Sequence, residues 1–195
     1  MNNIGCELQT GYAIGPCYNG MGGIKELYIV NSDYFNLVGS SFNSEDKITF
    51  LNMIGGNKWF RFELISETGE YNEKQITDSK TGSIFFEQNL TVVFHNNTSA
   101  LRKQLLQLIY TSGVACIFKD NHDLYWLAGA TRNMRVNSEL KWEKSFAGLN
   151  GEIRILNGLE PVPAYEVIGS AITYSDQVIT GGGRVQPQQS VVLPD

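Results

Sequence analysis

The sequence contains few residues of the kinds that usually carry chemistry. Only two histidines and three cysteines occur in 195 residues. Cys6, Cys17 and Cys116 are odd in number and match neither a CxxC motif nor a Cys/His ligand spacing, which argues against a disulfide framework and against structural zinc. We therefore expect unpaired thiols, and an inert, buried one at Cys116, since it lies between Ala115 and Ile117 in a strand-like run.

Clusters of basic residues and long apolar runs are missing as well. The net charge is −5, and acidic and basic residues are interspersed, so no Lys/Arg cluster can neutralise a row of phosphates. The first five residues have neither the basic nor the apolar segment of a secretion signal, and no run approaches the length needed to cross a bilayer. We therefore expect no tight nucleic-acid binding, no membrane association and synthesis in a cytoplasm.

The residues that are abundant favour β-structure. Aromatic residues make up 11% of the chain, glycine occurs 20 times, and Thr, Val, Ile and Phe recur, a composition typical of strands joined by tight turns. A chain of this length is long enough to bury one core. We expect strands at residues 24–30, 48–51, 59–65, 83–95, 114–119, 124–129, 133–136, 151–156 and 165–168.

Alternating side chains give the best evidence for two of these strands. In residues 83–95, one face carries Ile84, Phe86, Leu90, Val92 and Phe94, interrupted only by Gln88. Residues 151–156 alternate charged and isoleucine side chains with the same period of two. Residues 66–82 are polar and rich in turn formers, and we expect a hairpin or loop there that projects from the sheet and could contact a neighbour.

One helix is predicted, at about residues 99–111. Leu101, Leu105, Leu108 and Ile109 form a single apolar stripe, and Gly113 can end the helix in the left-handed conformation. The fold class is therefore mainly β, an antiparallel β-sandwich or open barrel with one packed α-helix. We expect this domain at residues 24–168, between an extended N-terminal arm at 1–23 and an extended C-terminal arm at 169–195.

No group of residues predicts catalysis, a cofactor or a metal. Asp120-Asn121-His122-Asp123 fits a tight turn better than a metal or acid/base site, because Asp and Asn hydrogen-bond to their own backbone. His95 lies at the end of a predicted strand, and no serine or cysteine of the sequence stands in a recognisable nucleophile motif that it could activate. The glycine-rich segments 20–25 and 181–184 match no phosphate-binding pattern. We expect a protein that is not an enzyme.

Several short motifs give a resemblance to a known family. They are Cys17 followed by Gly22-Gly23-Ile24-Lys25, the Asp120-Asn121 turn before Tyr125-Trp126-Leu127-Ala128-Gly129, and Tyr165-Glu166-Val167. Over residues 17–168 the chain resembles the tail tube-like structural proteins of bacteriophages that infect Bacteroidetes, including crAss-like phages. It departs from that pattern at His122, where the family has glycine, and in its long C-terminal arm, which fits a neck or tail ring protein as well as a tube subunit.

The resemblance implies a virion structural protein of the phage tail or neck. Its copies would join edge to edge into a homo-oligomeric ring around a lumen through which DNA passes without specific binding, next to other tail, neck or portal-side proteins. Ring closure would also cover exposed sheet edges. An alternative is a receptor- or carbohydrate-binding β-module of a phage fibre, in which Trp59, Trp126 and Trp142 could stack on sugars.

Overall fold

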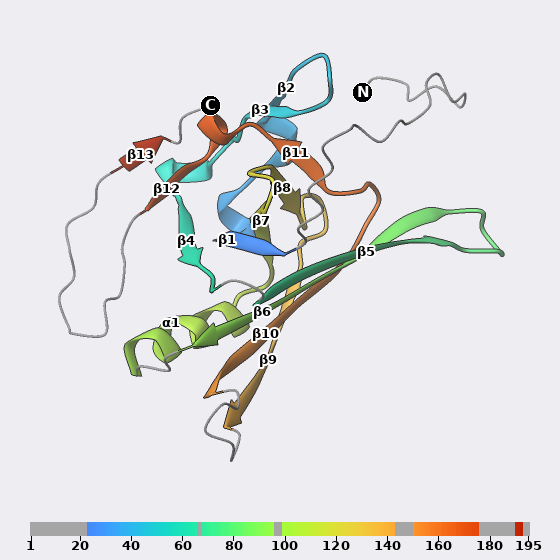
Figure 1. Ribbon diagram of the computed structural model, residues 1–195. Coiled ribbons are helices and arrows are strands. Elements are labelled where there is room, and N and C mark those ends of the chain that lie inside the picture. Colours follow the sequence, from blue (N-terminus) through green and yellow to red (C-terminus); the bar gives the residue numbers. More distant parts are fainter. Residues whose placement is uncertain (1–22, 66–67, 96–98, 143–149, 176–189, 193–195) are drawn as a thin grey trace, which may run out of the picture.

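The computed structural model describes residues 23–65, 68–95, 99–142, 150–175 and 190–192. These residues form two β-sheets and one α-helix (Figure 1). The predicted fold class is confirmed: the chain is mainly β, with a large curled sheet, a smaller second sheet and a single packed helix in the described part.

The larger sheet has nine strands in the order β13-β12-β4-β1-β7-β8-β11-β3-β2 and curls into a half-barrel. Its strands are β1 (Ile24–Asn31), β2 (Ser41–Phe42), β3 (Ile48–Phe50), β4 (Trp59–Glu63), β7 (Val114–Asp120), β8 (Tyr125–Ala128), β11 (Tyr165–Val167), β12 (Thr173–Ser175) and β13 (Ser190–Val192). Most neighbours are antiparallel, and only β11 with β3 and β12 with β4 are parallel.

The smaller sheet has four strands in the order β5-β6-β10-β9, all antiparallel to their neighbours. Its strands are β5 (Gly69–Thr77), β6 (Ile84–His95), β9 (Arg135–Trp142) and β10 (Asn150–Glu160). These strands are long and cross the end of the half-barrel as a separate layer (Figure 1).

Two apolar clusters form the core, and β1 lies between them. Tyr28 and Val30 on one face of β1 belong to the cluster enclosed by the curled sheet. Leu27 and Ile29 on the other face belong to the cluster between the two sheets, which also includes Leu90 of β6. Because both faces are covered, β1 has a nearly continuous apolar run rather than an alternating one.

The helix α1 (Ser99–Ile109) closes one side of the cluster between the sheets. It matches the predicted helix in position and ends two residues earlier than expected. Leu105 is fully buried and Leu108 is partly buried, while Leu106 and Tyr110 are exposed. The helix is therefore attached through a narrow apolar stripe.

The segment at residues 66–82 proved to be half of a long hairpin. Gly69–Thr77 forms β5, which pairs with β6 along its whole length, and the turn lies at residues 78–83. The predicted strands at 133–136 and 151–156 are also longer, since β9 runs to Trp142 and β10 to Glu160. Sequence reasoning missed these extensions because their side chains are largely polar on both faces.

The charged residues of β10 face inward. Glu152 and Arg154 are 4% and 1% exposed, whereas Ile153 and Ile155 on the opposite face are only partly buried. The two buried side chains form an ion pair of 2.5 Å. Burial lowers the pKa of the Arg154 guanidinium, and the neighbouring Glu152 carboxylate opposes that shift.

The folded part of the chain continues past the predicted boundary at Ile168. Ile172 and Tyr174 are 0% and 4% exposed, and β12 pairs with β4, so residues up to Ser175 belong to the domain. The C-terminal arm predicted from residue 169 is wrong for this stretch. Most of both predicted arms, including the glycine-rich segment 181–184, lies outside the described residues.

Candidate assembly interface

The four-stranded sheet has two open edges in the described part of the chain. β5 pairs only with β6, and β9 pairs only with β10. Each edge therefore presents a row of backbone N–H and C=O groups with no strand beside it, which can pair with another chain.

The two edges have opposite strand directions. Because each strand is antiparallel to the next, β5 and β9 of one copy also run antiparallel to one another. If β5 of one copy is placed beside β9 of another, the alternation of strand direction continues without a break. Contacts of this head-to-tail kind produce a ring when the rotation between copies closes.

One face of this sheet is not covered by the rest of the described molecule. The other face packs on the curled sheet and includes Leu90, Val92 and Leu156. From the register, the uncovered face carries Glu70, Asn72, Lys74, Glu87, Asn89, Thr91, Val93, Arg135, Asn137, Glu139, Ile153, Ile155, Asn157 and Leu159. Amide and hydroxyl groups are frequent among these residues, whose described side chains include two basic and three acidic ones.

A cluster of hydrogen bonds joins the β5–β6 hairpin to the body of the protein. One carboxylate oxygen of Glu73, Oε2, accepts from the Tyr71 hydroxyl at 2.8 Å, from Gln88 Nε2 at 3.1 Å and from the Ala164 backbone N–H at 2.8 Å. Gln88 in turn accepts from the Gly129 N–H at 2.9 Å. Gln88, which interrupts the apolar face of β6, is thus 1% exposed and hydrogen-bonded through both its amide nitrogen and its amide oxygen.

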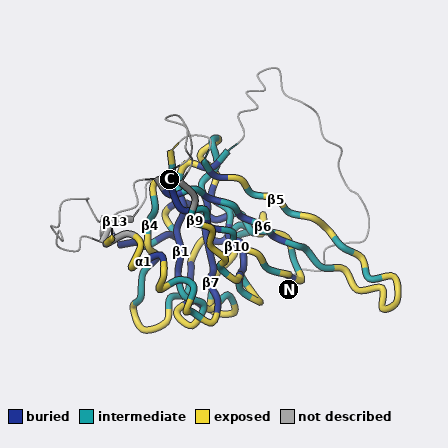
Figure 2. The backbone as a smooth tube through the Cα atoms, turned by 90° about the horizontal axis from the view of Figure 1, so that it is seen from below, coloured by how far each residue is buried: buried dark blue, intermediate teal, exposed yellow. Residues whose placement is uncertain are grey.

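Beyond this cluster the hairpin leaves the body. Pairing between β6 and β10 stops at Phe86, on the side of the hairpin turn. Residues 76–85 therefore have strand partners only within the hairpin. Figure 2 shows this end of β5 and β6 extending away from the buried core. Ile84 is 53% exposed there. At the turn, Asp78 accepts from the Lys80 N–H and the Thr81 hydroxyl, and these bonds lower the pKa of its carboxyl.

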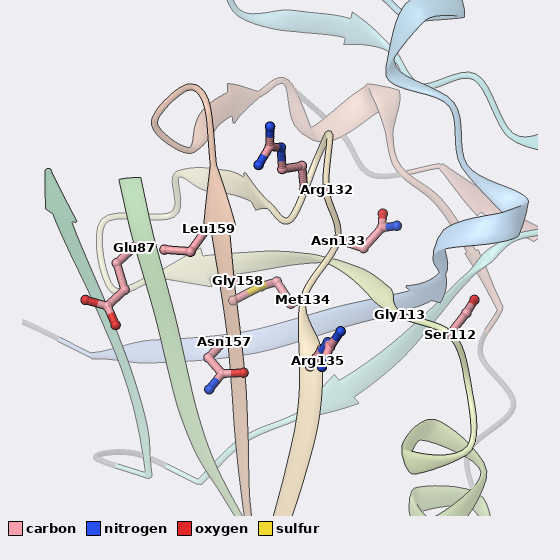
Figure 3. Close-up of a pocket in the computed structure, with 10 residues that line it drawn as sticks. All are labelled: Glu87, Ser112, Gly113, Arg132, Asn133, Met134, Arg135, Asn157, Gly158 and Leu159. Carbon is pink, nitrogen blue, oxygen red and sulfur yellow. The ribbon is translucent and has the colours of Figure 1, made fainter. Parts of the chain in front are cut away.

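A depression of about 470 Å³ lies where β9 begins, and we call it the β9 notch (Figure 3). It arises because β10 continues to Glu160 while its last pair with β9 is Asn157 with Arg135. Its lining residues are Glu87, Ser112, Gly113, Arg132, Asn133, Met134, Arg135, Asn157, Gly158 and Leu159.

Hydrogen bonds and close packing hold the turn at one side of the notch. The Glu160 carboxylate, 1% exposed, accepts from the backbone N–H groups of Thr131 at 3.0 Å and Arg132 at 2.8 Å. Asn133 has a positive φ of 65°, and a Cβ at Gly158 would lie 2.8 Å from its carbonyl oxygen. These contacts fix the turn that presents Arg132.

A second polar cluster lies on β1 and β4. Glu26 accepts from the Tyr28 hydroxyl and from Arg61 Nη2 at 3.1 Å, and the Arg61 guanidinium stands 5.6 Å from the centre of the Tyr174 ring. Burial, the hydrogen bond to Glu26 and its charge raise the pKa of Tyr28. The raised pKa keeps the Tyr28 hydroxyl protonated, so in this cluster it donates a hydrogen bond to the Glu26 carboxylate.

The Asp120–Asp123 run forms a turn, and Cys116 lies in the core. Asp120 accepts from the His122 and Leu124 N–H groups, and Asp123 has a φ of 64°, so the predicted tight turn is confirmed. Cys116 is fully buried and unpaired, and burial raises the pKa of its thiol to about 12. Cys6, Cys17 and the side chain of His95 lie outside the described residues.

The tryptophans give little support to sugar stacking. Trp59 is 0% exposed, which contradicts the idea that it is available to a ligand, and Trp126 is half-buried and donates to Asp120 at 3.1 Å. The side chain of Trp142 is outside the described part. Within that part, no three His, Cys, Asp or Glu side chains lie close enough together to hold a metal ion, and no helix is long and apolar enough to span a membrane.

No protein-family model, curated protein or solved structure matches this chain. The resemblance to phage tail proteins therefore rests on the short motifs of the sequence. The sheet edges and the β9 notch were not predicted from the sequence. The one sequence signal in this region was Gln88, whose position within an apolar face indicated the hydrogen-bond cluster at the base of the hairpin.

Proposed function

We propose that this chain is a virion structural protein, the subunit of a homo-oligomeric ring in the tail or neck of a bacteriophage, and that it catalyses no reaction. The observation that carries the proposal is the pair of open, oppositely directed edges β5 and β9 on one four-stranded sheet. The motif resemblance supplies the virion setting.

In such a ring the four-stranded sheets of successive copies form one continuous wall. The uncovered face of that wall would be turned toward the lumen, because the curled sheet covers the other face. Among the described side chains of this face, three are acidic and two are basic, so they supply no excess of positive charge that would retain passing DNA. The fibre-module alternative loses Trp59, whose side chain is buried and cannot stack on a sugar.

The proposal is tested by native mass spectrometry combined with hydrogen exchange. We expect one closed oligomer in which the amides of β5 and β9 exchange more slowly than in the dissociated subunit. The matched control is the short strand β2, which lies at an edge of the other sheet and should exchange equally in both states. Oligomers that protect β2 and leave β5 and β9 unchanged would refute the proposed ring contact.

A further inference from the structure

We propose that the β9 notch binds the projecting end of the β5–β6 hairpin, residues 76–85, of a neighbouring copy of this chain. The inference rests on the proposed ring and adds to it a second contact that locks adjacent subunits together. It assigns a partner to the notch and a function to the hairpin.

Strand lengths place the hairpin at the notch. Within one copy, Asn72, Asn89, Asn157 and Arg135 lie in one row across the sheet. β9 begins at this row, whereas β5 continues past it to Thr77. When β5 of one copy runs along β9 of the next, its last residues and the turn behind them pass beyond the start of β9. The space they reach is the notch.

The hairpin needs a partner. A two-stranded ribbon is at best marginally stable in water. In this hairpin no third strand lies beside residues 76–85. Ile84 is therefore exposed, and Ile76 and Phe85 are only partly buried. In the notch, Leu159 of β10 is 48% exposed, because β9 does not extend far enough to pair with the last residues of β10. Docking removes both apolar surfaces from water.

Charge also matches between hairpin and notch. The guanidinium groups of Arg132 and Arg135 make no ion pair in the described part of the chain, and both residues are exposed. The hairpin turn carries the Asp78 carboxylate, which can accept from an arginine in the planar, two-bonded geometry. Lys80 of the same turn can pair with Glu87 on the opposite wall of the notch.

The turn beside the notch is already held in place by contacts within its own copy. The Glu160 hydrogen bonds and the close approach of Gly158 to Asn133 hold the turn that carries Arg132 before binding, so little ordering cost falls on that side. The hairpin is likewise anchored at its base by Glu73. Complementary charge between the notch and a hairpin held at its base suits a contact that repeats between identical copies.

Disulfide trapping tests the inference. In a chain with Cys6→Ser and Cys17→Ser, the pair Thr77→Cys and Arg132→Cys should cross-link under mild oxidation and shift most of the protein to a ladder of disulfide-linked multimers. Each single variant should remain monomeric on a denaturing, non-reducing gel. The matched control pairs Thr77→Cys with Arg102→Cys on the exposed side of α1, and it should give no ladder.

The outcomes separate this inference from the ring itself. Closed rings in electron micrographs without cross-linking of the Thr77/Arg132 pair would overturn the hairpin contact and leave the ring standing. Cross-linking of the Thr77→Cys single variant with itself would place two hairpins together and overturn it too. No rings and no multimers would overturn both proposals.

Discussion

Single polar residues inside apolar surroundings hold the separate parts of this protein together. Glu73, Gln88 and Glu160 each satisfy backbone N–H groups from a different element, and each is placed where the strand pattern would favour an apolar residue. Sequence patterns could show that Gln88 interrupts a face. They could not show its partners, because these come from segments distant in the sequence.

Replacement of Glu73 tests this anchoring at the residue scale. Glu73→Leu removes the acceptor of three hydrogen bonds, and we expect it to lower the free energy of unfolding by about 2 kcal/mol. Glu70→Leu, an exposed change on the same strand, should have little effect. Urea denaturation measures both, and equal losses in the two variants would contradict the anchoring role.

The ion pair of Glu152 and Arg154 gives a second prediction at this scale. Glu152→Leu alone leaves a buried guanidinium uncompensated, and we expect a loss of about 3 kcal/mol in unfolding free energy. The double change Glu152→Leu with Arg154→Met should recover most of it, since both charges are gone. Equilibrium unfolding of the two variants measures the difference, and a double variant no more stable than the single one would refute the explanation.

At the scale of elements, the sequence predicted strands best where apolar side chains recur, on one face as in β6 or on both faces as in β7 and β8. β6, β7 and β8 follow the expected positions closely, as does α1. β5 escaped prediction as a strand because its uncovered face carries Glu70 and Lys74, while its inner face carries Glu73 and Gln75. An edge strand with a polar anchor on its buried side has no apolar period to detect.

The helix is held by few side chains, and this gives a prediction for the element. Leu105→Ala should lower the free energy of unfolding by about 3 kcal/mol. Among the described side chains of α1, that of Leu105 is the one that is fully buried. Tyr110→Ala, directly after the helix and 84% exposed, is the control and should change stability little. Thermal unfolding followed by circular dichroism compares them. Similar losses for both would mean that the helix packs differently.

At the scale of the whole molecule, the two sheets divide the tasks. The curled sheet encloses its own apolar cluster and ends in short strands, which offer little edge for pairing. The four-stranded sheet has long edge strands, one uncovered face and a hairpin that extends beyond the body (Figure 2). Sequence composition predicted the β class, but the position of the open edges depends on pairing between distant strands and could not be read from it.

Electron microscopy of the purified full chain tests the ring most directly. Class averages should show closed rings with a central channel, in which the four-stranded sheets form a continuous inner wall and β5 of each copy adjoins β9 of the next. Two-fold dimers, or particles in which β5 and β9 of adjacent copies lie apart, would contradict the account.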